Sequence, residues 1–230
     1  MKRSLINRVI REAEELMAEH SFLLPPFGKY TLEDWQKCDR AACQEIFDLG
    51  LGWDVTGFGK EDFFRIGLLL FTLRNGKAGS SVYSKPYAEK IMVVREEQVT
   101  LCHFHWNKQE DIINRGGGNL VIELTASDPA NNALKGGKFE ITVDGQKRIM
   151  DSGERLILTP GESVTLLPCH AHSFWAEKGS GTVLAGEVSM VNDDSTDNCF
   201  VLEKEALRYD PVEEDEKPYR LLCAEYAKWL

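Results

Sequence analysis

The spacing of the histidines is the feature of the sequence with the clearest chemical meaning. Four of the five histidines stand in two His-x-His pairs, His103 with His105 and His170 with His172. Alternate side chains of a β-strand project from the same face, so each pair predicts two neighbouring imidazoles. Such rings pack poorly in an apolar core, whereas neutral imidazole is a good ligand for divalent transition metals. The spacing therefore predicts a metal site.

A carboxylate follows the first pair closely enough to join it. Glu110 can return to the same metal if the chain turns after His105, and the glycines 116–118 then allow the chain to reverse. With the second pair, the predicted ligand set is three imidazoles and one carboxylate. This set leaves coordination positions for water or substrate oxygens.

The elements that would hold these residues are mainly strands. Residues 4–19 carry apolar side chains at helical spacing after Ser4, a potential N-cap, and Thr31 with Asp34 predicts a second helix that continues over 41–49. From about residue 66, short apolar segments alternate with turns, which predicts an antiparallel sandwich or barrel. The expected strands are 66–74, 90–95, 99–106, 119–125, 139–143, 146–150, 155–158, 163–167 and 182–191. We expect one domain, 1–230, with a helical layer over about 1–60 packed on a barrel over about 61–230.

Composition excludes several classes of protein. The 230 residues carry 37 Asp and Glu against 27 Lys and Arg, a net charge of −10. The sequence therefore lacks the basic surface typical of proteins that bind nucleic acid or anionic membranes. An apolar signal segment or membrane span is not apparent, and the six cysteines form no Cys-x-x-Cys pair. We expect reduced cysteines and a cytoplasmic location.

The histidine pairs resemble the two signature motifs of the cupin superfamily. The first motif, G-x5-H-x-H-x3,4-E-x6-G, is matched in register by His103, His105, Glu110 and Gly117, although Glu97 replaces the leading glycine. This resemblance implies a mainly β protein, a cupin-type antiparallel β-barrel (jelly roll), with the N-terminal helices packed on it.

The second cupin motif bears on the choice between His170 and His172. It combines a Pro-Gly turn with a histidine near a second proline, here Pro160-Gly161 and Pro168. The match implies that His172, rather than His170, is the fourth metal ligand.

Longer strings are similar to the D-lyxose isomerases, a family of cupin sugar ketol-isomerases. The resemblance covers nearly the whole chain and includes 1–7, 52–56, 71–76, 85–90 and 103–118. It implies a metal-dependent aldose–ketose isomerase that interconverts D-lyxose with D-xylulose and D-mannose with D-fructose. It also implies a homodimer and Mn²⁺ as the metal, with Co²⁺, Ni²⁺, Fe²⁺ or Zn²⁺ as alternatives.

Candidates for proton transfer come from positions that match this family. The acidic string 213–216 resembles a family string whose first acids approach the metal, which makes Glu213 the preferred base and Glu214 its substitute. Lys90 shares a strand face with Met92 and Val94, so it can point into the barrel and act in catalysis or substrate binding. Strand alternation alone makes Glu187 a second substrate-binding candidate.

Three other functions remain open at this point. One is a hexose-phosphate isomerase, which should require basic residues around the pocket. Cupin ligand sets also serve non-haem iron dioxygenases, and a cupin can bind a sugar without converting it, because ligands alone do not determine the reaction. Oxygen consumption with Fe²⁺ would identify the dioxygenase. Binding of D-lyxose without turnover would identify the sugar-binding cupin.

Overall fold

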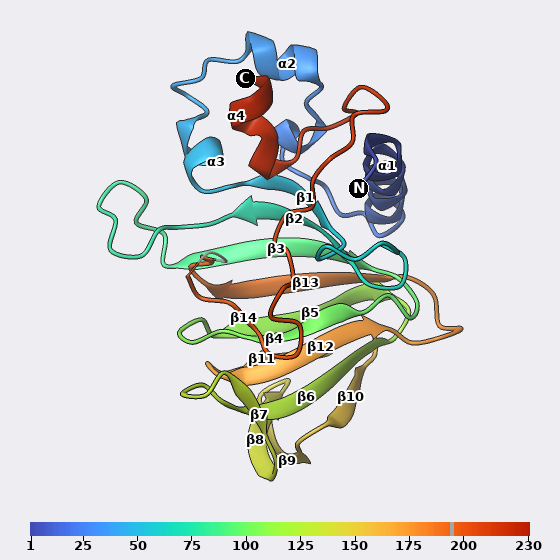
Figure 1. Cartoon of the computed structure of the whole chain (residues 1–230), viewed down its shortest axis with the longest axis vertical. Coiled ribbons are helices and arrows are strands. Elements are labelled where there is room, and N and C mark those ends of the chain that lie inside the picture. The colour runs from blue at the N-terminus through green and yellow to red at the C-terminus, as the bar shows by residue number, and fades with distance from the viewer. Residues whose placement is uncertain (194–195) are drawn as a thin grey trace.

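The computed structural model of the protein describes residues 1–193 and 196–230 and is built mainly from two antiparallel sheets (Figure 1). The larger sheet has eight strands, in the order β1-β2-β3-β13-β5-β11-β8-β9. Its members are β1 (Gly52–Thr56), β2 (Leu68–Arg74), β3 (Tyr87–Val94), β13 (Val183–Met190), β5 (Glu110–Gly117), β11 (Ser163–Leu166), β8 (Lys138–Val143) and β9 (Gln146–Asp151).

The smaller sheet closes the barrel and carries both histidine pairs. Its order is β10-β6-β12-β4-β14, and the short strand β7 pairs with β6. The strands are β10 (Glu154–Leu158), β6 (Leu120–Asp128), β12 (His170–Ala176), β4 (Thr100–Phe104), β14 (Cys199–Phe200) and β7 (Ala133–Lys135).

The helices gather at one end and along one side of the larger sheet. Figure 1 shows α2, α3 and α4 together beyond β1, at the end opposite β8 and β9, while α1 lies beside β1 to β3. The helical segments are α1 (Arg3–Glu19), η1 (Pro26–Lys29), α2 (Leu32–Lys37), α3 (Gln44–Asp48), η2 (Cys223–Glu225) and α4 (Tyr226–Trp229). In the described part of the chain, no helix is long and apolar enough to cross a membrane.

The helix termini differ in part from the prediction. Ser4 is not the N-cap of α1. That position is Lys2, and the backbone N–H and hydroxyl of Ser4 both donate to the carboxylate of Asp215 at 2.8 and 2.7 Å. The capping box of α2 is present as expected, with Thr31 and Asp34 each accepting from the other's backbone N–H. The third helix is shorter than the predicted 41–49.

The hairpin between β8 and β9 shows how local sequence sets register. Asp144 and Gly145 both have positive φ, 48° and 77°, as a type I′ turn requires, and Val143 pairs with Gln146 across it. Each of the nine predicted strand segments overlaps an observed strand. The prediction located β12 only through the pair His170 and His172. It omitted β1, β5, β7 and β14, which are short or rich in glycine and which pairing with neighbouring strands stabilises.

Two apolar clusters explain the long apolar run on β2. Leu70 belongs to the cluster inside the barrel, whereas Leu69 and Phe71 point outward and pack against α1. Ile6 and Ile10 of α1 are fully buried in this outer cluster. Because α1 covers the outer face, β2 is buried on both faces and needs apolar residues at consecutive positions.

Candidate metal centre and buried charge network

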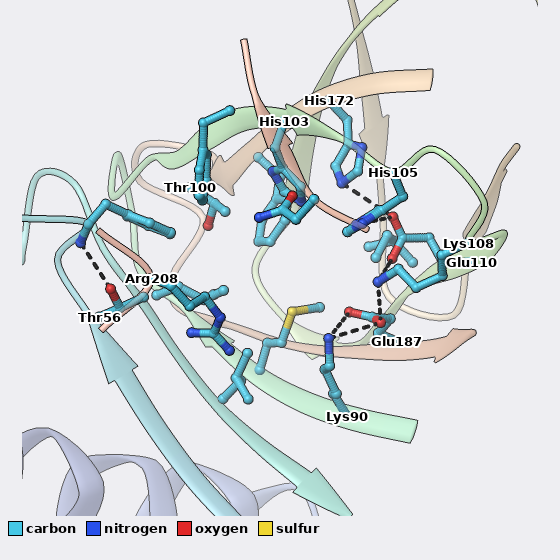
Figure 2. A pocket seen from close by; sticks show the side chains of 18 residues that line it. Thr56, Lys90, Thr100, His103, His105, Lys108, Glu110, His172, Glu187 and Arg208 are labelled. Carbon is cyan, nitrogen blue, oxygen red and sulfur yellow. Dashed lines mark hydrogen bonds and ion pairs between the residues drawn. The ribbon is translucent and has the colours of Figure 1, made fainter. Parts of the chain in front are cut away.

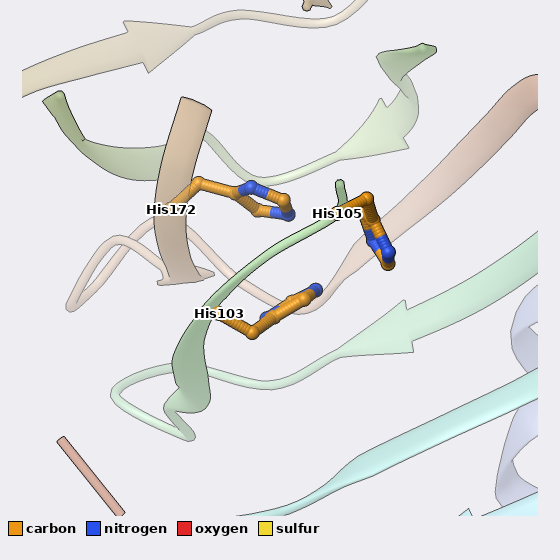
Figure 3. Close-up of side chains that lie close together, drawn as sticks. All are labelled: His103, His105 and His172. Carbon is orange, nitrogen blue, oxygen red and sulfur yellow. The ribbon is translucent and has the colours of Figure 1, made fainter. Parts of the chain in front are cut away.

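Three imidazoles converge inside the barrel from two adjacent strands. His103 lies on β4 and pairs directly with His172 on β12, while His105 follows the end of β4. One ring nitrogen from each lies within 4.8 Å of the other two, and Figure 3 shows the three rings grouped together. The predicted convergence of His103 and His105 is present, with their ring centroids 5.2 Å apart.

Hydrogen bonds to backbone carbonyls determine which nitrogens are available. Nδ1 of His103, His105 and His172 lies 2.8, 2.5 and 3.1 Å from the carbonyl oxygens of Leu101, Asp197 and His170. A carbonyl only accepts, so each Nδ1 carries the proton and each Nε2 keeps its lone pair. This is the arrangement that orients histidines as metal ligands.

The protonation state of the rings also suits a metal. Burial, followed by the neighbouring histidines His172 and His105, holds the pKa of His103 well below its ordinary value. Burial likewise lowers the pKa of His105 despite the attraction of Glu110. Neutral rings are the form that binds a divalent cation.

Glu110 completes the predicted ligand set at the start of β5. Its Oε1 lies 3.6 Å from Nε2 of His105 and 3.4 Å from Nε2 of His172, while its Oε2 lies 2.7 Å from Nζ of Lys108. Burial alone would raise the pKa of Glu110, but Lys108 and the imidazoles outweigh burial and hold it well below the ordinary value. The donor set therefore fits a divalent transition ion with open positions.

The two histidines of the second pair lie in different surroundings. The His172 side chain is buried among the ligands, whereas His170 lies with its ring centroid 5.3 Å from that of Phe139. His170 is not part of the three-histidine group among the described residues.

A chain of alternating charges leads away from Glu110 along the cavity wall. Nζ of Lys108 lies 2.9 Å from Oε1 of Glu187, and Nζ of Lys90 lies 3.3 Å from the same oxygen. Figure 2 shows this chain from Glu110 through Lys108 and Glu187 to Lys90. Both lysines also donate to Oδ1 of Asn192, at 2.7 Å from Lys90 and 3.2 Å from Lys108.

The lysines control the ionisation of Glu187. Burial would raise the pKa of this carboxyl, but attraction to Lys108 and Lys90 outweighs burial, so the pKa lies below its ordinary value. Sequence reasoning identified Lys90 and Glu187 but omitted Lys108. Lys108 lies in the turn between β4 and β5, so strand periodicity gives no signal for it.

These groups line one cavity inside the barrel, which encloses about 540 Å³ of space between protein atoms, part of it open to solvent. Its wall is polar at the metal ligands and apolar elsewhere. The lining residues are Thr56, Phe58, Leu68, Leu70, Lys90, Met92, Thr100, His103, His105, Lys108, Glu110, Ile112, His172, Phe174, Glu187, Asn198, Phe200 and Arg208.

Glu213 and Glu214 do not line this cavity. Glu213 is exposed and pairs through its backbone with Met1 and Arg3 at the start of α1. Glu214 accepts from Nε of Arg3 at 2.9 Å and also pairs with Lys228. Both expected bases thus lie in the C-terminal segment next to α1, whereas the four predicted metal ligands, Lys90 and Glu187 line one cavity.

Comparison with known proteins identifies the family. The family model described as D-lyxose isomerase matches residues 1–226. The chain belongs to the D-lyxose isomerase family. Two relatives named D-lyxose/D-mannose isomerase, from Serratia proteamaculans and Escherichia coli O157:H7, are 50% and 49% identical over 230 and 229 residues, with 100% of both chains covered in each comparison. The predicted family is confirmed, and the protein is a sugar isomerase.

Solved structures agree with the predicted fold. The L-ribose isomerase of Cellulomonas parahominis with L-ribose has a TM-score of 0.59 at 14% identity. That of Geodermatophilus obscurus has a TM-score of 0.60 at 15% identity, and each comparison covers 93% of this chain and 98% of the other. At such identities the likeness concerns the fold alone, and it confirms the cupin-type barrel.

Proposed function

We propose that the protein is a metal-dependent isomerase that interconverts D-lyxose with D-xylulose and D-mannose with D-fructose. The names of the two relatives from Serratia proteamaculans and Escherichia coli O157:H7 support these substrates. One observation carries the chemistry: a buried carboxylate, Glu187, lines the same cavity as three convergent imidazoles and Glu110.

The metal in this proposal is held by His103, His105, His172 and Glu110. Mn²⁺ is our first choice because of the family resemblance, with Co²⁺, Ni²⁺, Fe²⁺ and Zn²⁺ as alternatives of similar ligand preference. When bound, the cation supplies Lewis-acid stabilisation for negative charge that develops on the sugar oxygens.

The proton transfer is assigned to Glu187. Aldose-to-ketose isomerisation removes the proton from C2 to give an enediolate and returns it to C1, while the proton of the C2 hydroxyl moves to the C1 oxygen. A base for this step must lie within reach of both carbons, and Glu187 is a buried carboxylate in the cavity wall. Glu213 and Glu214 are set aside because Arg3, Lys228 and the start of α1 hold them outside the cavity.

Lys90 and Lys108 favour release of the proton that Glu187 takes up. Lys90 and Lys108 keep Glu187 ionised before the reaction, as the lowered pKa of Glu187 indicates. When Glu187 takes the C2 proton, both ammonium groups lose part of their countercharge, so the protonated carboxyl is short-lived and reprotonates the neighbouring carbon. Lys90 also offers N–H donors to sugar oxygens, which makes it a substrate-binding residue in this proposal.

Turnover of D-lyxose and D-mannose with and without metal tests the function. The Mn²⁺-loaded protein should form D-xylulose and D-fructose, and removing the metal with a chelator should abolish turnover until Mn²⁺ is restored. In D₂O, solvent deuterium should enter the product at the carbon that receives the proton. Neither sugar being converted with any of the five metals would refute the proposal.

A single ligand variant tests the metal site separately. His103→Ala should lose both bound metal and activity, because it removes one of three imidazole ligands. Unchanged Mn²⁺ affinity in this variant would contradict the site assignment.

Family membership does not favour two of the alternatives, the iron dioxygenase and the non-catalytic sugar-binding cupin. Oxygen consumption or binding without conversion would revive them.

The homodimer and the cytoplasmic location belong to the same proposal and rest on the resemblance and the composition. Sedimentation of the purified protein tests the first, and cell fractionation tests the second.

A further inference from the structure

An irregularity in β4 directs one side chain into the cavity. Regular alternation along the strand would place that side chain on the opposite face. His172 pairs with His103, and Phe174, two residues later on β12, pairs with Thr100, which is three residues before His103. β4 therefore contains one extra residue at this point, as in a β-bulge. Bulges of this kind redirect side chains and are frequent beside active sites. As a result, Thr100 lines the cavity together with His103.

The hydroxyl of Thr100 has no hydrogen-bond partner in the part of the chain that the structure describes. Its residue is 2% exposed, and Oγ1 makes no hydrogen bond to any described residue. A buried hydroxyl without a partner destabilises the fold, because its lost hydration is not replaced. Thr56, in the same cavity wall and equally buried, shows the contrast, because its Oγ1 accepts from the backbone N–H of Phe58 and donates to Asp210.

A second unpartnered atom in the same wall defines the chemistry of the ligand. Oδ1 of Asn198 is also buried without a hydrogen bond to the described residues. An amide oxygen only accepts, whereas a threonine hydroxyl both donates and accepts. Together they match neutral hydroxyl groups, which carry a donor and acceptors, better than a phosphate or a carboxylate, which offers only acceptors.

The position of Thr100 indicates which hydroxyls these are. Figure 2 shows Thr100 on one side of His103, and Glu110, Lys108, Glu187 and Lys90 on the other. In the proposed function, C1 and C2 of the sugar lie at Glu187. The remaining carbons of an open-chain sugar then extend toward Thr100.

We propose that Thr100, with Asn198, forms a subsite that hydrogen-bonds a hydroxyl of the sugar beyond C2, so that Thr100 determines substrate specificity. This inference rests on the proposed function. D-Lyxose and D-mannose share the configuration at C3 and C4, so one hydroxyl subsite serves both sugars.

Thr100→Val in the Mn²⁺-loaded protein tests the subsite, because valine keeps the shape and removes only the hydroxyl. We expect KM for D-lyxose and D-mannose to rise by roughly 5–30-fold, the factor that corresponds to the loss of one such hydrogen bond. The kcat and the metal content should stay within about twofold of wild type. Thermal stability should be equal or higher, because a buried unpartnered hydroxyl is removed. Thr165→Val, on β11 away from the cavity, is the matched control and should leave KM unchanged.

Deoxy sugars identify the hydroxyl. Among 3-deoxy-, 4-deoxy- and 6-deoxy-D-mannose, wild type should discriminate against the analogue that lacks the contacted hydroxyl, and Thr100→Val should lose this discrimination, as a double-mutant cycle requires. An unchanged KM in Thr100→Val, or discrimination that persists in it, would overturn the assignment. If wild type converts no sugar, the proposed function fails. Calorimetric measurement of sugar binding then tests the Thr100 subsite separately. At least fivefold weaker binding by Thr100→Val than by wild type would support the subsite, and a smaller difference would refute it.

Discussion

Among the described residues, a buried network of cations and carboxylates in the barrel differs from one at the start of α1 in what surrounds it. In the barrel, Lys90 and Lys108 share Glu187 beside the metal ligands and line an open cavity. At the start of α1, Arg3 is fully buried between Glu214 and Glu225, which come from the C-terminal segment. The residue types are alike, but only the first network faces space that a substrate can enter.

The chemistry of the cations matches this difference. Arg3 contacts both oxygens of Glu214, through Nε and Nη2 at 2.9 Å each, and also both oxygens of Glu225. The planar guanidinium group thus uses its N–H donors on the two carboxylates, and these contacts hold the two ends of the chain together. The lysines are point charges shared among Glu110, Glu187 and Asn192, so a sugar oxygen can replace one contact without dismantling the network. The role of a buried carboxylate therefore depends on the groups and the space around it, and its charge alone does not identify that role.

The largest expected effect distinguishes the two networks by catalysis. Glu187→Gln should lower kcat by roughly 10²–10⁴-fold, because the amide cannot take a proton, while bound metal is unchanged. Glu213→Gln, an exposed position beside the Arg3 network, should stay within about twofold of wild type. Steady-state turnover of D-lyxose with metal analysis of each variant provides the measurement. An equal loss of kcat in Glu187→Gln and Glu213→Gln would contradict the proposed difference between the two networks.

A variant of the Arg3 network should affect stability instead of chemistry. Arg3→Met leaves Glu225 buried without its cation, which should lower the free energy of unfolding by about 3–5 kcal/mol, as for other broken buried pairs. The kcat of the folded fraction should not change. Urea unfolding tests this, with Arg8→Met on the exposed side of the same helix as the control, expected within about 0.5 kcal/mol of wild type. A variant as stable as wild type would show that Arg3 does not hold the C-terminal segment.

The smallest expected effect is the pH dependence contributed by Glu214. Its pKa is lowered from 4.5 to about 2, chiefly by the hydrogen bond from Arg3, which outweighs burial, with help from Lys228. A carboxyl with a lowered folded-state pKa stabilises the fold above its unfolded pKa, and this contribution disappears as the pH falls toward the folded value. The stability difference between wild type and Glu214→Gln should therefore be full at pH 7 and shrink between about pH 5 and pH 2. Unfolding curves across this range measure it, and a constant difference would contradict the pairing with Arg3.

Some site residues could be predicted from sequence and others could not. His103 and His105 are two residues apart on one strand, so local alternation brings their rings together, and the cupin motif then adds Glu110 and His172. Lys108 was omitted because a turn between β4 and β5, closed by the backbone N–H groups of residues 107 and 108 donating to Asp197, directs it into the cavity. No local pattern reports such a distant partner.

The acids of the C-terminal segment illustrate the same limit. The string at 213–216 resembles a functional motif, but long-range pairing with Arg3 and Ser4 decides where its side chains lie. Thr100 is the opposite case, because alternation from His103 would place its side chain on the other face and only the extra residue in β4 turns it inward.

The sequence by itself determined the family, the strand-rich barrel and the convergent imidazoles, since these depend on short periodic patterns and on spacings of a few residues. Only the tertiary structure decided which carboxylate faces the cavity, which cations balance it, and that Thr100 joins the wall. Those outcomes depend on strand register, a bulge and ion pairs between segments up to 222 positions apart. Side-chain periodicity carries no information about contacts at that separation, because the folded chain alone brings such segments together.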